Sequence, residues 1–412
     1  MTSAISIVGG AYGEECAYPT RQVFRGSGGR AAAVLSSLGA EVTLTTALDT
    51  RLSPIFASIA EKLNYKLKTK SRPEDIWFRY RHPVGHPVIY PASISNVTYD
   101  SPLVTDNALV FGMLEGRPQV CAKRAVYDPQ DGIAAKAFGA NGSTAEQLAL
   151  VMSFSEGKAL TGETTPQAMA DKLIAEQSVS VVIIKCGPQG ALVRNESGTN
   201  WIRAFPSQRV YKIGSGDVFS AAFAFSWLIE GHDELTSAWY ASAAVAAYVE
   251  SAQDRFSHDQ HSQFHERAKL ALEARTETAP RQIPDTQIYL AGPFFSTAQQ
   301  WLIDEVRAAL TDMGFKVFSP VHEIGLGPAR EVAPADLLAL EQSGLVLALI
   351  DGLDPGTVFE VGYARARDIP VVAIAESVDE PSLTMIIGSG CEVTNDLTTG
   401  IYAACWHLMG DV

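Results

Sequence analysis

Short apolar runs, each followed by a glycine-rich turn and a helical segment, recur along most of this chain. This alternation constrains the fold more than any other feature, because strands that alternate with helices form a mainly parallel sheet. The sequence therefore predicts an α/β fold, and its 412 residues indicate two domains rather than one. In the first part of the chain we expect strands over 5–8, 42–45, 108–111, 125–127 and 179–185, and helices over 29–38 and 218–229.

The alternation stops near Asp254, where a polar stretch rich in histidine and charge begins. A second, shorter series of apolar runs starts at Ile288. It is long enough for a small doubly wound sheet, with a helix capped by Ser296 and further strands over 316–319, 345–350 and 369–375. We therefore expect a first domain over 1–255, a helical connector over 256–285 and a smaller domain over 286–412.

Charge and cysteine usage exclude several classes of protein. A net charge of −14, from 32 basic and 46 acidic side chains, argues against a nucleic-acid partner. The five cysteines are far apart and form no CxxC pair, which favours neither a zinc site nor a disulfide framework. No apolar run reaches the roughly 18 residues of a membrane span, and the N-terminus lacks the pattern of a signal peptide. We expect a cytoplasmic enzyme that acts on a small molecule and does not bind a membrane.

Several polar residues of the second domain are expected at one edge of its sheet. Tyr289 lies in the first strand, and Asp336 is expected at the start of a helix over 337–342. Another helix should begin at Pro355, which places Glu360 in its first or second turn. Open α/β sheets bind ligands at the carboxyl ends of their strands, and paired carboxylates suit glycosidic-bond chemistry.

Each of these residues also has a structural interpretation. Asp354 before Pro355 is typical of a helix N-cap, and Asp336 could be a cap as well. Glu360 could complement the helix dipole, and Tyr289 could belong to the core. These interpretations do not explain why three carboxylates and a tyrosine are all expected at one edge.

Two segments, Tyr-Leu-Ala-Gly-Pro at 289–293 and Asp-Pro-Gly-Thr-Val-Phe-Glu-Val-Gly-Tyr-Ala at 354–364, resemble the signatures of the nucleoside 2-deoxyribosyltransferase family. The resemblance extends over residues 286–412. It implies a retaining double displacement at an N-glycosidic bond, without a cofactor. By this resemblance Glu360 is the nucleophile, Tyr289 orients it and Asp336 protonates the leaving base. The resemblance also implies substrate contacts at Asp354, Gly292, Phe294 and Gly356.

Asp354 bears on the substrate. In the family the equivalent acid holds sugar hydroxyls, and a carboxylate at this position would repel a phosphate. The resemblance therefore implies a substrate with a free 5′-hydroxyl. Transfer to a second base and hydrolysis by water both stay open, as do ribose and 2-deoxyribose.

In the first domain, Gly214-Ser215-Gly216-Asp217 precedes an apolar helical segment. Glycines at a helix N-terminus expose N–H groups to an anion, and an aspartate there could act as a base in phosphoryl transfer. The alternative is a glycine-rich turn in which Asp217 is only the helix N-cap.

The first 250 or so residues resemble the ribokinase (PfkB) family of sugar and nucleoside kinases. The motifs that carry the resemblance occur in the family's order: Gly-Gly-Arg-Ala-Ala at 28–32, Asp128-Pro129, Glu156 with Leu-Thr-Gly at 160–162, Gly-Pro-Gln-Gly at 187–190, and 214–217. The resemblance implies a ribokinase-like α/β/α domain that uses ATP and Mg²⁺, followed here by a smaller flavodoxin- or Rossmann-like domain. It places substrate at Gly28 and Gly29, the ATP phosphates at Gly214, Ser215, Gly216, Gly187 and Gly190, the metal at Glu156 and the base at Asp217.

Three departures from the family pattern leave two functions open for this domain. Tyr-Lys-Ile at 211–213 replaces Asp-Thr-Thr, Ser153 replaces the asparagine of Asn-x-x-Glu, and Lys185 replaces a threonine. The domain is therefore either an ATP-dependent kinase or a binding domain for a sugar or nucleoside. Four basic or histidine residues where the family has a lid are either substrate contacts or solvated: Arg79, Arg81, His82 and His86.

Taken together, the motifs predict a bifunctional nucleoside or sugar enzyme that forms a homo-oligomer, since relatives of the second domain often complete their site from a neighbouring subunit. One alternative is a sensor in which a degenerate kinase-like domain binds a nucleotide and gates a nucleotide or NAD glycohydrolase. A weaker alternative is a binding scaffold without catalysis.

Overall fold

The computed structural model describes residues 3–130, 132–176, 179–274 and 283–410. The chain forms two compact units, one made of Met1–Ser207 and Tyr211–Pro280, the other of Gln208–Val210 and Arg281–Val412. Residues 258–273 of the predicted connector form helix α7, which packs on α6 (Glu234–Ser251) within the first unit. Residues 275–282 of that connector lie outside the described residues.

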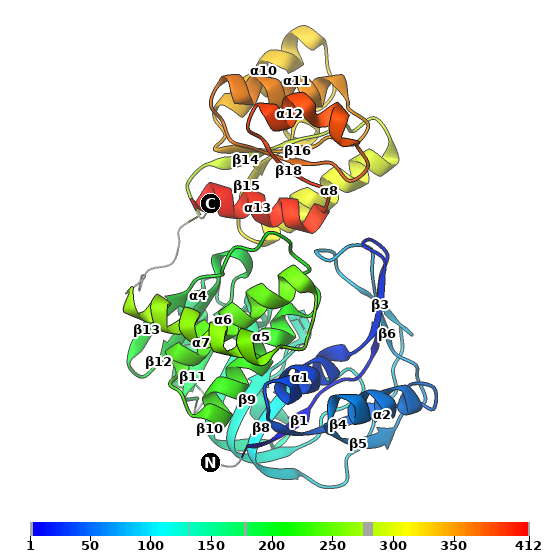
Figure 1. The fold of residues 1–412 in the computed structure, drawn as a ribbon, viewed down its shortest axis with the longest axis vertical. Helices are drawn as coiled ribbons and strands as arrows, with labels where there is room; N and C mark the ends of the chain where they lie inside the picture. Colours follow the sequence, from blue (N-terminus) through cyan, green and yellow to red (C-terminus); the bar gives the residue numbers. More distant parts are fainter. Residues whose placement is uncertain (1–2, 131, 177–178, 275–282, 411–412) are drawn as a thin grey trace. The chain divides into compact units, whose positions relative to one another are not determined.

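A nine-stranded sheet forms the centre of the first unit (Figure 1). Its order is β13-β12-β11-β10-β9-β8-β1-β4-β5. Strand β12 runs antiparallel to both β11 and β13, and the other neighbouring strands are parallel. The predicted α/β class, with its mainly parallel sheet, is confirmed. The strands are β1 (Ala4–Val8), β4 (Glu41–Leu48), β5 (Lys66–Ser71), β8 (Leu103–Phe111), β9 (Val120–Asp128), β10 (Thr144–Ser153), β11 (Val181–Lys185), β12 (Ala191–Asn195) and β13 (Gly198–Ile202).

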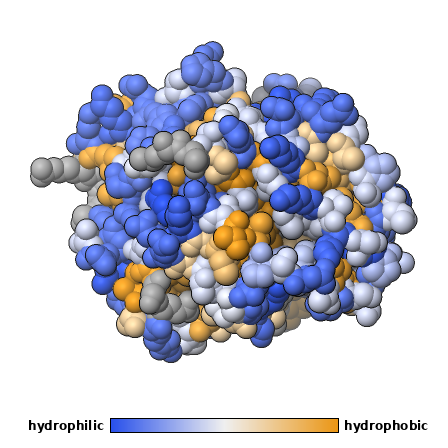
Figure 2. Space-filling model, turned by 90° about the horizontal axis from the view of Figure 1, so that it is seen from below, coloured by the Kyte–Doolittle hydropathy of each residue, from blue (hydrophilic) through white to orange (hydrophobic). Residues whose placement is uncertain are grey.

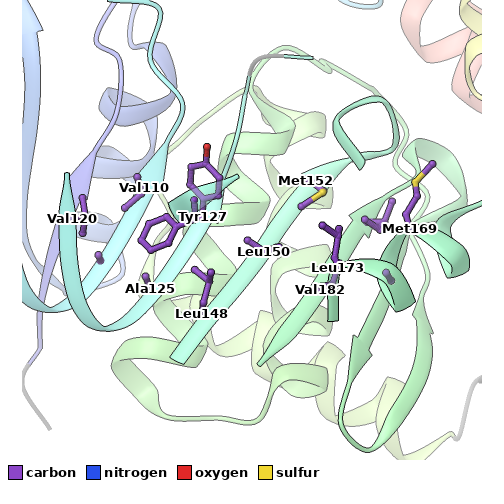
Figure 3. Close-up of a cluster of buried hydrophobic side chains, with 14 of the residues drawn as sticks. Val110, Val120, Ala125, Tyr127, Leu148, Leu150, Met152, Met169, Leu173 and Val182 are labelled. Carbon is purple, nitrogen blue, oxygen red and sulfur yellow. The ribbon is translucent and has the colours of Figure 1, made fainter. Parts of the chain in front are cut away.

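Helices cover both faces of this sheet. On one face, alternate residues of β8, β9 and β10 such as Val110, Tyr127 and Leu150 pack against Met169 and Leu173 of α4 (Figure 3). They share this face because side chains alternate along a strand. On the other face α5 packs against β8, β9, α1 and α6. The helices are α1 (Gly26–Ser37), α2 (Leu52–Leu63), α3 (Phe154–Thr161), α4 (Pro166–Glu176), α5 (Ser215–Ala224), the π-helix η4 (Phe225–Glu230), α6 (Glu234–Ser251) and α7 (His258–Glu273), with short 3₁₀ turns η1 (Gly132–Ala134), η2 (Phe138–Asn141) and η3 (Gly187–Gln189).

A separate four-stranded sheet of order β3-β2-β6-β7 carries the predicted lid residues. Arg79 lies on β6 and pairs with Glu15 of β2 at 3.4 Å. Arg81, His82 and His86 lie in the turn that follows β6, and His82 is buried rather than solvated. The strands are β2 (Gly13–Cys16), β3 (Arg21–Phe24), β6 (Trp77–Tyr80) and β7 (Val88–Tyr90).

The second unit has a five-stranded sheet, all parallel, of order β15-β14-β16-β17-β18. Helices α10, α11 and α12 lie on one face, and α8 and α13 lie on the other (Figure 1). The strands are β14 (Gln287–Ala291), β15 (Lys316–Phe318), β16 (Leu345–Leu349), β17 (Val371–Ile374) and β18 (Glu392–Thr394). The helices are α8 (Thr297–Asp312), α9 (Pro320–Glu323), α10 (Ala329–Glu341), α11 (Pro355–Ala366), η5 (Glu380–Leu383), α12 (Thr384–Gly388) and α13 (Leu397–Met409).

Local signals in the second unit were mostly confirmed, with one error. Ser296 caps α8 through a capping box, and Asp354 caps α11, which begins at Pro355. Asp336 does not begin a helix as predicted. It lies inside α10, which starts at Ala329 and contains Pro334 in its second turn.

Polar and charged side chains cover most of the face shown in Figure 2, with apolar side chains in small groups between them. Among the described residues, no helix combines the length and apolar character that crossing a bilayer requires.

Candidate active site

The second unit brings Tyr289 and Glu360 together at the carboxyl end of its sheet. Tyr289 is completely buried in strand β14, and its hydroxyl donates a hydrogen bond of 2.6 Å to Oε1 of Glu360. Glu360 lies in the second turn of α11, the helix that follows the neighbouring strand β16. The tyrosine therefore fixes one carboxylate oxygen in place and leaves Oε2 for other chemistry.

Burial and neighbouring charge set the ionisation of Glu360. The pKa of Glu360 is raised to about 7, mainly by burial. The hydrogen bond from Tyr289 has the opposite effect and lowers this pKa. The charges of Asp336 and Asp354 contribute to the rise of this pKa. Burial also raises the pKa of Tyr289, so its hydroxyl keeps its proton and stays a donor.

Asp336 reaches the same site from α10. Burial raises the pKa of Asp336, and its Oδ1 is enclosed without a hydrogen-bond partner among the described residues. An enclosed carboxyl group that lacks donors favours its protonated form, which is the form a general acid needs.

Asp354 has a structural role and also contributes charge to the site. Its Oδ2 accepts hydrogen bonds from the backbone N–H of Thr357 at 2.9 Å and from Oγ1 of Thr357 at 3.0 Å. A Cβ on Gly356 would come within 3.1 Å of the same oxygen, which explains the glycine there. The N-cap interpretation is thus correct, and the same carboxylate acts on the pKa of Glu360.

The other predicted substrate contacts are explained by packing. A Cβ on Gly292 would come within 2.9 Å of the end of the Ile303 side chain and within 3.2 Å of Leu349 Cβ, so close packing favours a small residue there. Phe294 is half-buried, packs on Phe295 with ring centroids 5.0 Å apart and accepts a hydrogen bond from Gln300 through its carbonyl oxygen. Gly292 and Phe294 lie in the loop that follows β14, whereas Gln300 and Ile303 lie in α8.

Sequence reasoning missed Phe318, whose ring stacks on Tyr289 with centroids 5.5 Å apart. The strand that contains Phe318 was predicted, but not its pairing with β14, where Phe318 lies beside Tyr289. Strand order depends on contacts between distant residues, so no local signal pointed to this aromatic neighbour.

In the first unit, the predicted anion-binding turn begins α5, but a buried arginine lies against it. Arg30 donates to Asp217 Oδ2 at 2.7 Å and also pairs with Glu14, and its side chain is only 3% exposed. A Cβ on Gly214 would come within 2.3 Å of Arg30 Cζ. Gln130 donates to the other Asp217 oxygen at 2.9 Å. Neither Arg30 nor Gln130 was identified from the sequence.

The alternative interpretation of Asp217 as an N-cap is wrong. The N-cap of α5 is Gly214, whose φ of +83° suits glycine, and Asp217 lies in the first turn of the helix. Burial raises the pKa of Asp217, against the opposing effect of Arg30. Gly28 and Gly29 lie in α1, where a Cβ on Gly28 would come within 2.7 Å of the Gly9 backbone. Close approach of α1 to β1 therefore explains the first of these glycines.

A second group of charges lies beside the same turn. Asp128 is fully buried, and its Oδ2 accepts from Lys185 Nζ and Ser220 Oγ, both at 2.7 Å. Its Oδ1 is enclosed without a hydrogen-bond partner among the described residues. Burial and the charge of Asp128 raise the pKa of Glu156, whose Oε2 accepts from the Ser153 backbone in a capping box.

The predicted phosphate-binding glycines lie close to Lys185. A Cβ on Gly216 would be 3.4 Å from Lys185 Nζ. Gly187 and Gly190 both have positive φ, and a Cβ on Gly190 would come within 1.9 Å of the Ile202 carbonyl oxygen. The Gly190 position therefore requires glycine for the backbone itself.

Comparisons with known proteins support two separate resemblances. Residues 288–395 match the model of the nucleoside 2-deoxyribosyltransferase family, and residues 148–260 match that of the pfkB family of carbohydrate kinases. Both predicted resemblances are confirmed, although the early glycines at 28–29 and Asp128 lie outside the second match. No curated protein matches the chain in sequence.

Solved structures resemble the first unit. Phosphofructokinase-2 from Escherichia coli in complex with potassium is similar with a TM-score of 0.51 and 17% identity, over 65% of this chain and 100% of that one. Ribokinase from Thermotoga maritima is similar with a TM-score of 0.47 and 19% identity, over 64% of this chain and 99% of that one. The nucleoside kinase of Methanocaldococcus jannaschii has a TM-score of 0.47 and 13% identity, over 64% and 98%. The first of these likenesses shows a ribokinase-like fold, which confirms the predicted fold class.

Proposed function

We propose that the second unit cleaves or transfers the N-glycosidic bond of a nucleoside, with Glu360 as the nucleophile. The observation that carries this proposal is the 2.6 Å hydrogen bond that joins Tyr289 to Glu360 beside a second enclosed carboxyl group, Asp336. This is a nucleophile, an orienting group and an acid at the carboxyl end of one parallel sheet. The family match over residues 288–395 supports the same chemistry.

In the first step, Oε2 of ionised Glu360 attacks the anomeric carbon of the sugar and the bond from that carbon to the base nitrogen breaks. Asp336 gives its proton to the departing base. In the second step, a new base or a water molecule attacks the glycosyl ester, releases Glu360 and returns a proton to Asp336. Tyr289 holds Oε1 through both steps, so the nucleophile needs no reorientation.

Charge favours an unphosphorylated substrate. A helix N-terminus ordinarily attracts a phosphate through its free N–H groups. At the start of α11, Asp354 occupies the Thr357 N–H and adds a negative charge. A nucleoside with a free 5′-hydroxyl therefore suits this site better than a nucleoside 5′-monophosphate.

Base release from a panel of nucleosides, with and without a second base, tests this proposal. We expect Glu360→Gln to abolish release, because the amide is a poor nucleophile. Glu341→Gln is the matched control, since Glu341 also accepts a hydrogen bond from a tyrosine, Tyr363, but lies outside the site. Release that persists in Glu360→Gln, or that is lost equally in the control, contradicts the assigned nucleophile.

For the first unit we propose a binding site for a sugar or nucleoside. The resemblance to the kinase family implies ATP with a divalent cation. The carboxylates of Asp128 and Glu156 could hold that cation, because Asp128 Oδ1 is enclosed and has no hydrogen-bond partner among the described residues. A cation held there would neutralise charge on transferred phosphate. Asp217, however, can accept a substrate proton only after Arg30 withdraws from it.

The ion pair of Arg30 with Asp217 favours the second candidate, a ligand-binding domain in a sensor. Consumption of ATP with sugars or nucleosides separates the two. A kinase should consume ATP with one of these substrates and lose that activity in Asp217→Asn. Ligand binding without ATP consumption supports the sensor, in which the first unit regulates glycosidic cleavage by the second. A homo-oligomer and a cytoplasmic location are further parts of the proposal.

A further inference from the structure

One cluster of potential metal ligands lies outside both sites and consists of Glu230, His232, His261 and His265. Glu230 is the last residue of the π-helix η4, and His232 follows it after one glycine. His261 and His265 lie one turn apart on α7, so they share one face of that helix. Packing of α7 against α6 brings these histidines to the end of η4.

Three atoms that can bind a metal converge on one point. Nε2 of His261 and Nε2 of His265 are 3.0 Å apart. Oε1 of Glu230 lies 3.2 Å from the first nitrogen and 3.1 Å from the second. The three atoms therefore form a nearly equilateral triangle. His232 lies beside two members of the triangle, since the ligand atoms of Glu230, His232 and His265 all lie within 4.8 Å of one another and His232 Nδ1 is 3.4 Å from Glu230 Oε2.

Protons alone do not satisfy this triangle. If both Nε2 atoms carry hydrogens that point to Glu230, the two hydrogens crowd each other across the 3.0 Å contact. If one nitrogen lacks its hydrogen, it can accept from the other Nε2–H, but its lone pair then also faces the carboxylate oxygen. In addition, Oε2 of Glu230 is enclosed and accepts no hydrogen bond from the described residues. A cation inside the triangle relieves the crowding of Oε1 and the two nitrogens, because each of these three atoms then directs a lone pair at a positive charge.

The dimensions suit a small divalent ion. With bonds of about 2.0–2.1 Å, the ligand atoms of a tetrahedral zinc site lie about 3.3–3.4 Å apart. The observed triangle is a few tenths of an ångström smaller, so only slight outward movement of the side chains is required. Two histidines with three residues between them, as at 261 and 265, are also a common zinc-ligand pattern.

The surrounding side chains hold the imidazoles and leave a path for the ion. Tyr240 packs on His265 with ring centroids 4.8 Å apart, and Phe225 contacts His261 edge-on at 5.4 Å. The side chains of Glu230, His261 and His265 are 21%, 20% and 32% exposed, so solvent reaches the cluster. His232 Nδ1 lies 3.1 Å from Ser226 Oγ and would give up that contact to ligate.

We propose that Glu230, His261 and His265, with His232 as the fourth ligand, form a binding site for a divalent transition-metal ion, Zn²⁺ in particular. Imidazole and carboxylate ligands suit Zn²⁺ and its borderline neighbours rather than Mg²⁺ or Ca²⁺. The ion joins α7 to the end of η4, so it cross-links the last described helix of the first unit to its interior. Its role is therefore structural or regulatory and is independent of both proposed active sites.

Equilibrium binding of Zn²⁺ to the full chain, stripped beforehand with a chelator, tests this site. We expect one tightly bound Zn²⁺ per chain, with affinity reduced at least about 100-fold in His265→Gln, because even second-shell partners of a metal are worth about 10–100-fold. His407→Gln is the matched control, since His407 pairs with a glutamate, Glu392, but with no second histidine among the described residues. It should bind Zn²⁺ as the wild type does. Binding of equal strength in the wild type and His265→Gln overturns the proposal.

A spectroscopic arm identifies the ligands. Co²⁺ bound in place of Zn²⁺ should give the intense visible absorption of a four-coordinate nitrogen and oxygen site in the wild type and the control, but not in His265→Gln. A strong near-ultraviolet band from cobalt–thiolate bonds would instead show that cysteines hold the ion, and would overturn the proposal. If His265→Gln fails to fold, Glu230→Gln replaces it, because the amide keeps the size of the side chain.

Discussion

Replacing Tyr289 with phenylalanine removes one hydroxyl group and isolates the hydrogen bond to Glu360. The ring is completely buried and stacks on Phe318, and phenylalanine keeps that packing. Hydrogen bonds to charged groups contribute about 1.5–3 kcal/mol, which corresponds to about 1–2 pKa units. Because the hydrogen bond lowers the pKa of Glu360, its loss should raise that pKa from about 7 to about 8–9.

The pH dependence of kcat/KM for base release measures this change. The nucleophile must be ionised, so the acidic limb of the profile should move upward by about 1–2 pH units in Tyr289→Phe. At pH 7 the ionised fraction falls from about one half to about 1–10%, which predicts a loss of about 5–50-fold in kcat/KM. Tyr363→Phe, which removes the exposed hydroxyl bonded to Glu341, should leave the limb in place. An unchanged limb in Tyr289→Phe would refute the assigned coupling.

Three further perturbations follow from the same contacts. Burial raises the pKa of Glu360 from 4.5 to about 7, so between these pH values Glu360 is protonated in the folded chain but ionised in the unfolded chain. The folded chain therefore loses stability as the pH rises from about 4.5 to 7 and beyond. Thermal unfolding should therefore show that Glu360→Gln is more stable than the wild type at pH 8, by up to roughly 3 kcal/mol, and that this difference vanishes near pH 4. Equal differences at the two pH values would contradict the burial of this charge. Asp354→Ser keeps an N-cap residue but removes the charge, so the free energy of unfolding should change by less than about 1 kcal/mol. Chromatography should show more base released from nucleoside 5′-monophosphates, relative to nucleosides, than with the wild type. An unchanged ratio would mean that Asp354 does not select against phosphate. Arg30→Met leaves Glu14 and Asp217 buried without their cation, so urea unfolding should show that the free energy of unfolding falls by about 3–5 kcal/mol. A fall of less than about 1 kcal/mol would show that the ion pair is not buried in solution.

Features that depend on a few neighbouring residues were predictable. Ser296 and Asp354 cap α8 and α11 as expected, because an N-cap bonds to N–H groups two or three residues away. The position of Glu360 in the second turn of α11 follows from Pro355 at the first helical position. The alternative interpretation of Asp217 as a cap fails because Gly214, with its positive φ, caps the helix three residues earlier.

Features that join distant parts of the chain were not predictable. The ion pair of Arg30 with Asp217 spans 187 residues, and Phe318 meets Tyr289 only through the pairing of β14 with β15. The histidines of α7 were visible in the sequence, but Glu230 lies 31 residues before His261 and joins it only when α7 packs on α6.

The sequence by itself determined the α/β class, the two family resemblances and the identity of the chemical groups at each strand end, because periodicity and helix caps are local. The tertiary structure alone decided how those groups act. Burial beside Asp336 moves the pKa of Glu360 towards neutrality, and Arg30 neutralises Asp217. Both effects depend on the distance between charges and on their removal from water, and those are set only when elements far apart in the chain pack together.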